Sequence, residues 1–353
     1  MRPRDIHIAA TGSALAPLVT VEEALARGDC DPDTARRTEA LSVAVAGEES
    51  PAEMAAAAAR AALGRSGRDP ADIGLILHAA VYYQGHDLWP PASYVQRTAV
   101  GNRCPAVEVR QMSNGGMAAI DLAAGYLSAA RPGSAALITA ADRFSPPGFD
   151  RWRSDPGTVY ADGGVALVLA RGHGLARLRT IVTVSDPELE GMHRGDDPFG
   201  VAPFSVRRPM DLEVWKRAFV ARTGLSACLS RIAAGLREAV DTALDEAGVK
   251  LADVDRFLLP HFGRRRLAAA LLRPLGVDVE RTTWPWSRRV GHLGAGDQIA
   301  ALDHLLSSGA AAPGDTLMLL GIGAGFTWSC AVLEVTERPR WGTHSPGRPA
   351  PGV

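Results

Sequence analysis

Apolar runs of strand length alternate with longer helical patterns along most of the chain. An alanine-rich pattern over residues 54–65 predicts a helix, and the apolar run 75–77 that follows it predicts a strand. A second helix is expected over 117–130 and a second strand over 135–139. These strand runs are apolar on both faces, as in sheets that helices cover on both sides. The pattern therefore predicts a layered α/β fold.

The same succession of elements returns later in the chain. Asp72, just before the first strand run, corresponds to Asp253, and Pro132, which ends the second helix, corresponds to Pro313. The interval from Asp72 to Asp253 equals that from Pro132 to Pro313, and both pairs connect helices to strands in the same order. Self-similarity at one fixed offset indicates an internal duplication. We therefore expect two similar halves.

The duplication sets the expected domain organisation. The first half is expected over 1–180 and the second over 181–336. The segment 185–219, which holds four prolines, is expected to form loops that cap the molecule between the halves. The last stretch, 337–353, is rich in proline and glycine and is expected to be a disordered tail.

Charge and composition exclude several classes of protein. The chain has 38 basic and 39 acidic residues, so its formal net charge is −1, which argues against a protein that binds nucleic acid by neutralising phosphates. Only Lys216 and Lys250 are lysines, a bias that we interpret as the codon usage of a GC-rich genome. The four cysteines are scattered, with no CxxC pair and no histidine cluster at metal-ligand spacing, so free thiols and no bound metal are expected.

The chain shows no secretory or membrane signal. Its first residues carry charges and lack the apolar stretch of a signal peptide. The longest uncharged stretch, 316–333, is interrupted by Gly321, Gly323 and Gly325. It therefore predicts two strands around a glycine-rich turn instead of a membrane-spanning helix. We expect a cytoplasmic protein that does not enter a membrane.

The segment 110–117 is the sharpest candidate for chemistry. It joins the expected strand 106–109 to a helix and holds Ser113 followed by glycines, so the backbone can turn sharply there. A serine Oγ at the positive end of a helix suits a nucleophile, because the helix stabilises developing negative charge. The alternative is an ordinary helix N-cap, a position that serine and asparagine favour. Gln111 replaces the first glycine of the Gly-x-Ser-x-Gly hydrolase motif, which argues against that class.

Two histidines are candidate bases. His261 directly follows an apolar strand run, and ligands of open α/β sheets lie at the carboxyl ends of strands. His292 lies in a glycine-rich loop before the next helix, with Asp297 five residues on as a candidate to orient its ring. The alternatives are a satisfied core role for either histidine and a helix-cap role for Asp297. His86 and Trp89 lie in an aromatic loop that either lines a pocket or packs on its neighbours.

Five motifs occur in one order along the chain. They are the segment 110–117, Asp162-Gly163-Gly164, Leu259-Pro260-His261, Gly291-His292-Leu293-Gly294 and Gly321-Ile322-Gly323-Ala324-Gly325-Phe326-Thr327-Trp328. Their order and spacing resemble those of β-ketoacyl-acyl carrier protein synthase III enzymes, which are condensing enzymes of the thiolase fold. The resemblance covers residues 5–336. It implies a thiolase-like duplicated α-β-α-β-α layered fold with two similar halves, in agreement with the internal repeat.

The resemblance also implies roles for residues, with two departures from the family pattern. In the family a cysteine stands at the position of Ser113, a histidine at that of His261 and an asparagine at that of His292. Backbone N–H groups of the nucleophile and of a glycine matching Ala324 form its oxyanion hole. A serine hydroxyl needs a neighbouring base, and His292 offers one in place of an asparagine that helps to stabilise an enolate. These features resemble a polyketide and antibiotic branch of the family, some of whose members use serine in acyl transfer.

We therefore expect an acyltransferase. Ser113 would take an acyl group from acyl-CoA or acyl carrier protein and pass it to a carrier protein or another acceptor. His292 or His261 would act as the base, and Asp297 would orient His292. One alternative is a starter-unit β-ketoacyl synthase that condenses the acyl group with malonyl carrier protein. Another is a catalytically inactive partner of a synthase.

The expected partners follow from this chemistry. The acyl thioester of coenzyme A or of a phosphopantetheine arm is a substrate, and no other cofactor is expected. Acyl carrier proteins are usually acidic, so the run Arg264-Arg265-Arg266 beside His261 is a candidate entrance, with a solvated helix start as the alternative. His86 and Trp89 are candidates to contact the substrate. The family resemblance implies a homodimer.

Overall fold

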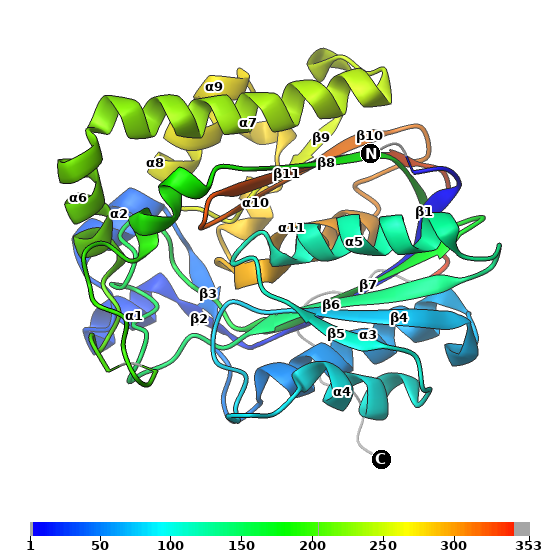
Figure 1. Ribbon diagram of the computed structural model, residues 1–353, viewed down its shortest axis with the longest axis horizontal. Helices are drawn as coiled ribbons and strands as arrows, with labels where there is room; N and C mark the ends of the chain where they lie inside the picture. Colours follow the sequence, from blue (N-terminus) through cyan, green and yellow to red (C-terminus); the bar gives the residue numbers. More distant parts are fainter. Residues whose placement is uncertain (1–2, 204, 342–353) are drawn as a thin grey trace.

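Within the described residues, 3–203 and 205–341 of the computed structural model, nine strands form one mixed sheet (Figure 1). Their order is β5-β4-β6-β7-β1-β8-β11-β10-β9. Their bounds are β1 (Ile6–Leu15), β4 (Ile73–Ala79), β5 (Ala106–Val109), β6 (Ala135–Asp142), β7 (Gly163–Arg171), β8 (Ala176–Ser185), β9 (Arg256–Leu258), β10 (Thr316–Gly323) and β11 (Thr327–Val335). Two short strands, β2 (Leu18–Thr20) and β3 (Ser42–Ala44), pair with each other.

The sheet consists of two similar runs of strands that meet at β1 and β8. In the first run β4 pairs parallel with both β5 and β6, and β7 lies antiparallel between β6 and β1. In the second run β10 pairs parallel with β9, and β11 lies antiparallel between β10 and β8. The runs join through the antiparallel pairs His7–Arg177 and Ile8–Ala176.

Helices cover both runs and fill the space between them. The longer helices are α3 (Pro51–Ser66), α5 (Gly115–Ala129), α6 (Leu212–Thr223), α7 (Leu225–Ala247) and α11 (Asp297–Ser308). The short helices are α1 (Val21–Arg27), α2 (Pro32–Thr38), α4 (Pro91–Val95), α8 (Arg264–Leu267), α9 (Arg273–Leu275) and α10 (Trp284–Ser287). Helix α3 packs on the first run and α7 on the second, whereas α5 and α11 contact strands of both runs (Figure 1). The expected layered α/β architecture is confirmed.

The sequence offset recurs in the positions of the elements. Strands β6 and β10 are of equal length, and the interval between their first residues, Ala135 and Thr316, equals the one between Asp72 and Asp253. The short 3-10 turns Pro70–Asp72 and Leu251–Asp253 are separated by the same interval. The boundary expected between residues 180 and 181 falls inside β8, so the second run of strands begins a few residues earlier. Most of the expected tail, 342–353, lies outside the described residues.

Three further features bear on the class of the protein. No helix in the described part of the chain is long and apolar enough to cross a membrane. The four cysteines are free thiols, three of them buried. Among the described residues, no three His, Cys, Asp or Glu side chains are grouped so that they could hold a metal ion.

Candidate active site

Ser113 lies at a tight turn between β5 and α5. Met112, just before it, has a positive φ of 49°, a conformation that large side chains rarely adopt. The next residue, Asn114, is fully buried and fixes the turn from inside. Its amide donates hydrogen bonds to Gln111 Oε1 (2.7 Å) and to Ser329 Oγ (2.8 Å) in β11. Ser113 is therefore held at the start of α5 by contacts to both halves of the molecule.

Two glycines allow neighbouring elements to approach this turn closely. A Cβ on Gly323, at the end of β10, would lie 2.4 Å from the Gln111 carbonyl oxygen. A Cβ on Gly116, in α5, would lie 2.3 Å from the carbonyl oxygen of Ala295. Ala295 belongs to the 3-10 turn Gly294–Gly296, which leads directly into α11. Because Gly116 has no side chain, the beginnings of α5 and α11 can meet.

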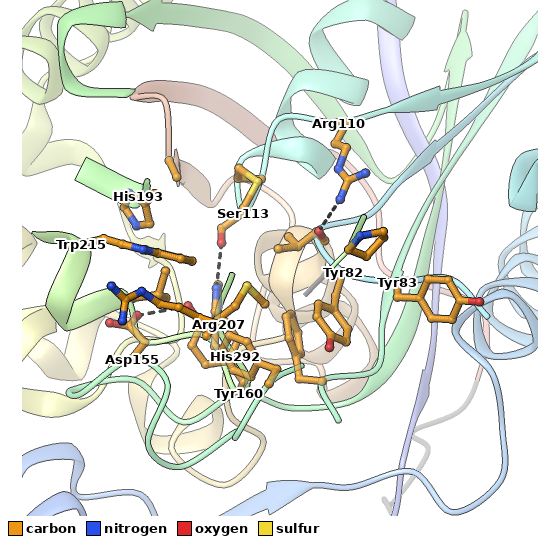
Figure 2. A pocket seen from close by; sticks show the side chains of 18 of the residues that line it. Tyr82, Tyr83, Arg110, Ser113, Asp155, Tyr160, His193, Arg207, Trp215 and His292 are labelled. Atoms are coloured by element: carbon orange, nitrogen blue, oxygen red, sulfur yellow. Dashed lines mark hydrogen bonds between the residues drawn. The ribbon is translucent and has the colours of Figure 1, made fainter. Parts of the chain in front are cut away.

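This meeting of helix starts places three polar side chains in a chain of hydrogen bonds. Ser113 Oγ lies 2.9 Å from His292 Nε2 (Figure 2), and His292 Nδ1 lies 2.5 Å from Asp297 Oδ2. With an ionised Asp297 accepting the Nδ1–H proton, Nε2 is left to accept the hydrogen bond of the Ser113 hydroxyl. The arrangement is the nucleophile, base and carboxylate series that activates a hydroxyl group.

Asp297 is buried at the first position of α11. Its Oδ1 accepts a hydrogen bond from Leu293 N–H (2.7 Å), and its Oδ2 accepts one from His261 N–H (2.7 Å). Burial favours the neutral acid, but the neighbouring His261 and His292 and these hydrogen bonds outweigh it and hold the pKa of Asp297 below its ordinary value. The carboxylate therefore stays ionised and can fix the orientation of the His292 ring.

The backbone also positions His292. Its N–H donates to the Val159 carbonyl (2.8 Å), and its carbonyl accepts from Ala161 N–H (2.8 Å). The ring of Tyr160, between these two residues, packs edge-on against the His292 ring with centroids 4.9 Å apart. His292 is thus attached to the segment 159–161 on one side and to Asp297 on the other.

His261, the other candidate base, is buried beside Asp297, away from Ser113. Its Nδ1 lies 2.9 Å from the Gly291 carbonyl oxygen, and its ring packs edge-on against Trp286 with centroids 5.5 Å apart. Burial lowers the pKa of His261. Within the described residues its Nε2 has no hydrogen-bond partner, and it is not one of the side chains that line the cavity beside Ser113. Of the two histidines, the structure brings His292 to Ser113.

A cavity of about 910 Å³ opens beside Ser113 and His292 (Figure 2). Part of its wall is aromatic and consists of Tyr82, Phe144, Phe149 and Tyr160, whose rings pack on one another. His86, Trp89 and Ala324, which the sequence singled out, also line the cavity. Its volume is in the range of sites that bind small organic molecules.

An ion cluster that the sequence analysis missed lines the same cavity. Asp155 accepts hydrogen bonds from Arg266 Nη1 and Nη2 (2.6 and 2.8 Å), Lys216 Nζ (2.6 Å) and Tyr160 OH (3.1 Å). Burial opposes ionisation of Asp155, but the two cations hold its pKa well below the ordinary value. Asp155 and its two cations are far apart in sequence. The one available signal was that Lys216 is one of two lysines in the chain.

The run Arg264-Arg265-Arg266 in α8 does not present three open cations to the cavity. Arg266 lines the cavity but is bound to Asp155, whereas Arg265 is exposed and Arg264 half-buried outside the lining. Arg266 is therefore an ion-pair partner in the cavity wall. A substrate- or carrier-binding role for Arg264, Arg265 and Arg266 stays a prediction.

Sequence comparisons identify similar proteins over most of the chain. Residues 244–335 match the family described as 3-oxoacyl-[acyl-carrier-protein (ACP)] synthase III C terminal. The chain is 29% identical over 340 residues to a β-ketoacyl-[acyl-carrier-protein] synthase III of Rhizorhabdus wittichii, a match that covers 94% of this chain and 99% of that protein.

Solved structures agree with these matches. ChlB3, described as an acyltransferase, is 39% identical, with a TM-score of 0.92 over 96% of this chain and 100% of its own. The 3-oxoacyl-[acyl-carrier-protein] synthase III of Aquifex aeolicus is 21% identical and shares the fold, with a TM-score of 0.74 over 93% of this chain and 99% of its own. Given this likeness over nearly the full length, the chain belongs to the β-ketoacyl-[acyl-carrier-protein] synthase III-like enzymes of the thiolase fold.

Proposed function

We propose that this protein is an acyltransferase in which Ser113 carries an acyl group from a thioester donor to an acceptor. The observation that carries the proposal is the contact of 2.9 Å between Ser113 Oγ and His292 Nε2, continued to Asp297 at 2.5 Å. The similarity to ChlB3, described as an acyltransferase, supports this class of reaction. The name of the Rhizorhabdus wittichii relative supports an acyl carrier protein as a partner, and coenzyme A thioesters are the alternative donors.

In the first step Ser113 Oγ attacks the carbonyl carbon of the thioester, and His292 Nε2 takes the hydroxyl proton. The tetrahedral intermediate then collapses, the carbon–sulfur bond breaks and the imidazolium returns the proton to the leaving thiolate. Asp297 remains ionised throughout and stabilises the positive charge on His292. The products of this step are an ester on Ser113 and a free thiol.

The tetrahedral intermediate carries an oxyanion that needs hydrogen-bond donors. Ser113 lies at the start of α5, where N–H groups have no partner within the helix. Ala324 follows β10 and lines the cavity. We assign the oxyanion to the backbone N–H groups of Ser113 and Ala324, a contribution of roughly 3–4 kcal/mol per donor in other enzymes.

In the second step the acceptor, a thiol or a hydroxyl group, attacks the ester on Ser113. His292 takes the acceptor's proton as the new bond forms and gives it to Ser113 Oγ when the ester bond breaks. The same base therefore serves both half-reactions, and the site returns to its starting state. An acceptor must displace water from the cavity, because water would hydrolyse the ester.

The position of His261 favours transfer over decarboxylative condensation. Loss of carbon dioxide from a malonyl thioester leaves an enolate, whose charge must be stabilised by donors inside the site. His292 is already engaged by Ser113 and Asp297, and the His261 ring lies outside the lining of the cavity. The described site therefore supports transfer from an activated Ser113, and the Nε2 of His261, which has no hydrogen-bond partner among the described residues, remains a candidate donor for the alternative, condensation.

Mass spectrometry of the protein after incubation with a panel of acyl thioesters tests the proposal. We expect the acyl mass on the peptide that bears Ser113, and no such mass in Ser113→Ala. A malonyl thioester should add its whole malonyl group without release of carbon dioxide. An unmodified Ser113 peptide with every donor, or transfer that survives in Ser113→Ala, would show that the proposal is wrong. Carbon dioxide release would favour condensation instead.

A further inference from the structure

Lys216 and its neighbours form a polar region of the cavity that the proposed reaction does not use. Tyr160 connects this region to the catalytic series, because its ring packs on His292 and its hydroxyl donates to Asp155 (3.1 Å). In Figure 2, Ser113 and His292 lie between Tyr82 on one side and Asp155, His193 and Trp215 on the other. Tyr160 therefore lies between the polar region and His292 and contacts both.

The region carries more positive than negative charge. Lys216 and Arg266 share the single carboxylate of Asp155. The side chain of Lys216 is 21% exposed and that of Asp155 is 5% exposed. Glu213, one turn before Lys216 in α6, also attracts Lys216 and Arg266, but it is shared with Arg217 (3.6 Å), so three cations share two carboxylates. A charge in a cavity wall without its own counter-ion is costly, and an anionic group on a ligand would reduce that cost.

Lys216 has hydrogen-bonding capacity left for a ligand, whereas the terminal nitrogens of Arg266 are fully engaged. Both terminal nitrogens of Arg266 are engaged, by Asp155, Thr158 Oγ1 and the Pro156 carbonyl. The Lys216 ammonium has three N–H donors, and within the described residues one hydrogen bond occupies it, to Asp155. In a chain whose basic residues are nearly all arginines, the compact and freely rotating ammonium at this position suits a ligand oxygen.

His193 supplies a second unused polar group to the same region. It lines the cavity from the 3-10 turn Pro187–His193, and within the described residues its buried Nδ1 has no hydrogen-bond partner. Burial, with the nearby charge of Lys216, lowers the pKa of His193 to about 4. The ring is therefore neutral and can donate one hydrogen bond to a ligand oxygen.

We propose that Lys216 and His193 form a subsite for a carboxylate at the far end of the acyl group. The inference rests on the proposed transfer through Ser113. With the acyl carbonyl at Ser113, the chain would pass along Tyr160 and its anionic end would meet the Lys216 ammonium. The preferred donors are then thioesters of dicarboxylic acids, not those of plain alkanoic acids.

Two coenzyme A donors of similar length, glutaryl-CoA and pentanoyl-CoA, test the subsite. The readout is the ratio of their second-order rate constants for acylation of Ser113, followed by mass spectrometry. The wild-type protein should favour glutaryl-CoA, and Lys216→Met should lower this ratio by about tenfold or more, the usual effect of losing a hydrogen bond to a charged group. Lys216→Arg, which keeps the charge, should retain most of the preference.

The second lysine of the chain gives a matched control. Lys250 is exposed just before the 3-10 turn Leu251–Asp253 and does not line the cavity, so Lys250→Met should leave the ratio unchanged. If Lys216 only holds α6 in place, Lys216→Met will slow both donors by the same factor, which would overturn the subsite. A wild-type protein without preference for glutaryl-CoA would overturn it as well.

Failure of the proposed function is distinguishable from failure of the subsite. If no acyl thioester of the panel, including glutaryl-CoA and pentanoyl-CoA, acylates Ser113, the acyl-transfer proposal is wrong. Calorimetric titration of Ser113→Ala with the two thioesters then tests the subsite by itself. Tighter binding of glutaryl-CoA that is lost on adding Lys216→Met would support it, and equal binding of the two thioesters would contradict it.

Discussion

At the scale of single residues, the orientation of the base depends on Asp297. Its two oxygens accept from His292 Nδ1–H and from two backbone N–H groups. Asp297→Asn keeps the shape but replaces one acceptor by an NH₂ donor, so the amide cannot satisfy all three donors. We expect the rate of Ser113 acylation to fall by about 10³- to 10⁴-fold, as in serine proteases that lose the same carboxylate. Single-turnover acylation followed by mass spectrometry measures it.

Asp303 provides the control for this variant. It is also buried on α11, but it pairs with Arg65 (2.7 Å) and accepts from Thr11 Oγ1 (2.8 Å), and it does not line the cavity. Asp303→Asn should lower the free energy of unfolding while folded molecules acylate at the normal rate. Equal losses of rate in the two variants, or normal acylation by Asp297→Asn, would mean that Asp297 does not orient the base.

Residue positions could be predicted where the chemistry follows from a local motif. Ser113, His292 and Asp297 were candidates because each lies in or beside a glycine-rich turn that leads into a helix. The sequence does not decide between His292 and His261 as the base, since that choice depends on which ring faces the cavity. Asp155 was not predictable, because its partners Lys216 and Arg266 lie 61 and 111 residues away in no shared motif.

At the scale of elements, the site depends on how closely the start of α5 meets the turn before α11. Gly116→Ala would place a Cβ 2.3 Å from the Ala295 carbonyl oxygen, a backbone atom that cannot simply rotate away. The two helix starts must then separate, which would lengthen the contact between Ser113 and His292. We expect a loss of about 1–3 kcal/mol in the free energy of unfolding together with slower acylation, measured by urea denaturation and by single-turnover kinetics.

Gly125, in the same helix, is the matched control. It is exposed, and a Cβ added there would have no atom within 4 Å. Gly125→Ala should raise the free energy of unfolding by about 0.5–1 kcal/mol, because alanine restricts the unfolded chain and favours the helix. If Gly116→Ala behaves like Gly125→Ala in both assays, close approach of the helices is not what aligns the site.

The elements themselves were predictable to the extent that local pattern determines them. The fixed offset between the halves located β6 and β10 because both halves repeat the same pattern of polar turn and apolar strand. Helix α6 was missed. It begins at Leu212, inside the segment 185–219 that was expected to form loops. Of its residues, Leu212 and Phe219 alone are buried, so the sequence of α6 shows little of the repeating apolar face from which a helix is recognised.

At the scale of the whole molecule, several buried groups have different pKa values in the folded and the unfolded state, although the formal net charge is only −1. Burial lowers the pKa of His78 to about 4, and burial with Lys216 nearby does the same for His193, from an ordinary value of 6.5. Between about pH 4 and 6.5 the unfolded state therefore binds more protons than the native state, so the free energy of unfolding rises with pH. Each histidine should raise the free energy of unfolding by roughly 3 kcal/mol as the pH increases through this window.

One carboxyl group acts in the opposite direction. Burial raises the pKa of Asp142 to about 7 from 3.8, so between these values the native state holds a proton that the unfolded state has lost. Its contribution to stability therefore falls as the pH rises through this window. Because two histidines oppose one carboxyl group of similar shift, we expect the histidines to dominate and the native state to be more stable at pH 7 than at pH 4.5.

Urea denaturation across about pH 4 to 7 measures how the free energy of unfolding depends on pH. Two substitutions separate the contribution of the histidines from that of Asp142. His78→Gln removes one of the rising contributions and should flatten the dependence of the unfolding free energy on pH. Asp142→Asn removes the falling contribution and should steepen it. A stability that declines steadily from pH 4 to 7 even in Asp142→Asn, where the falling contribution is absent, would mean that these histidines are protonated inside the folded protein. The neutral His193 ring that the carboxylate subsite requires would then be contradicted as well.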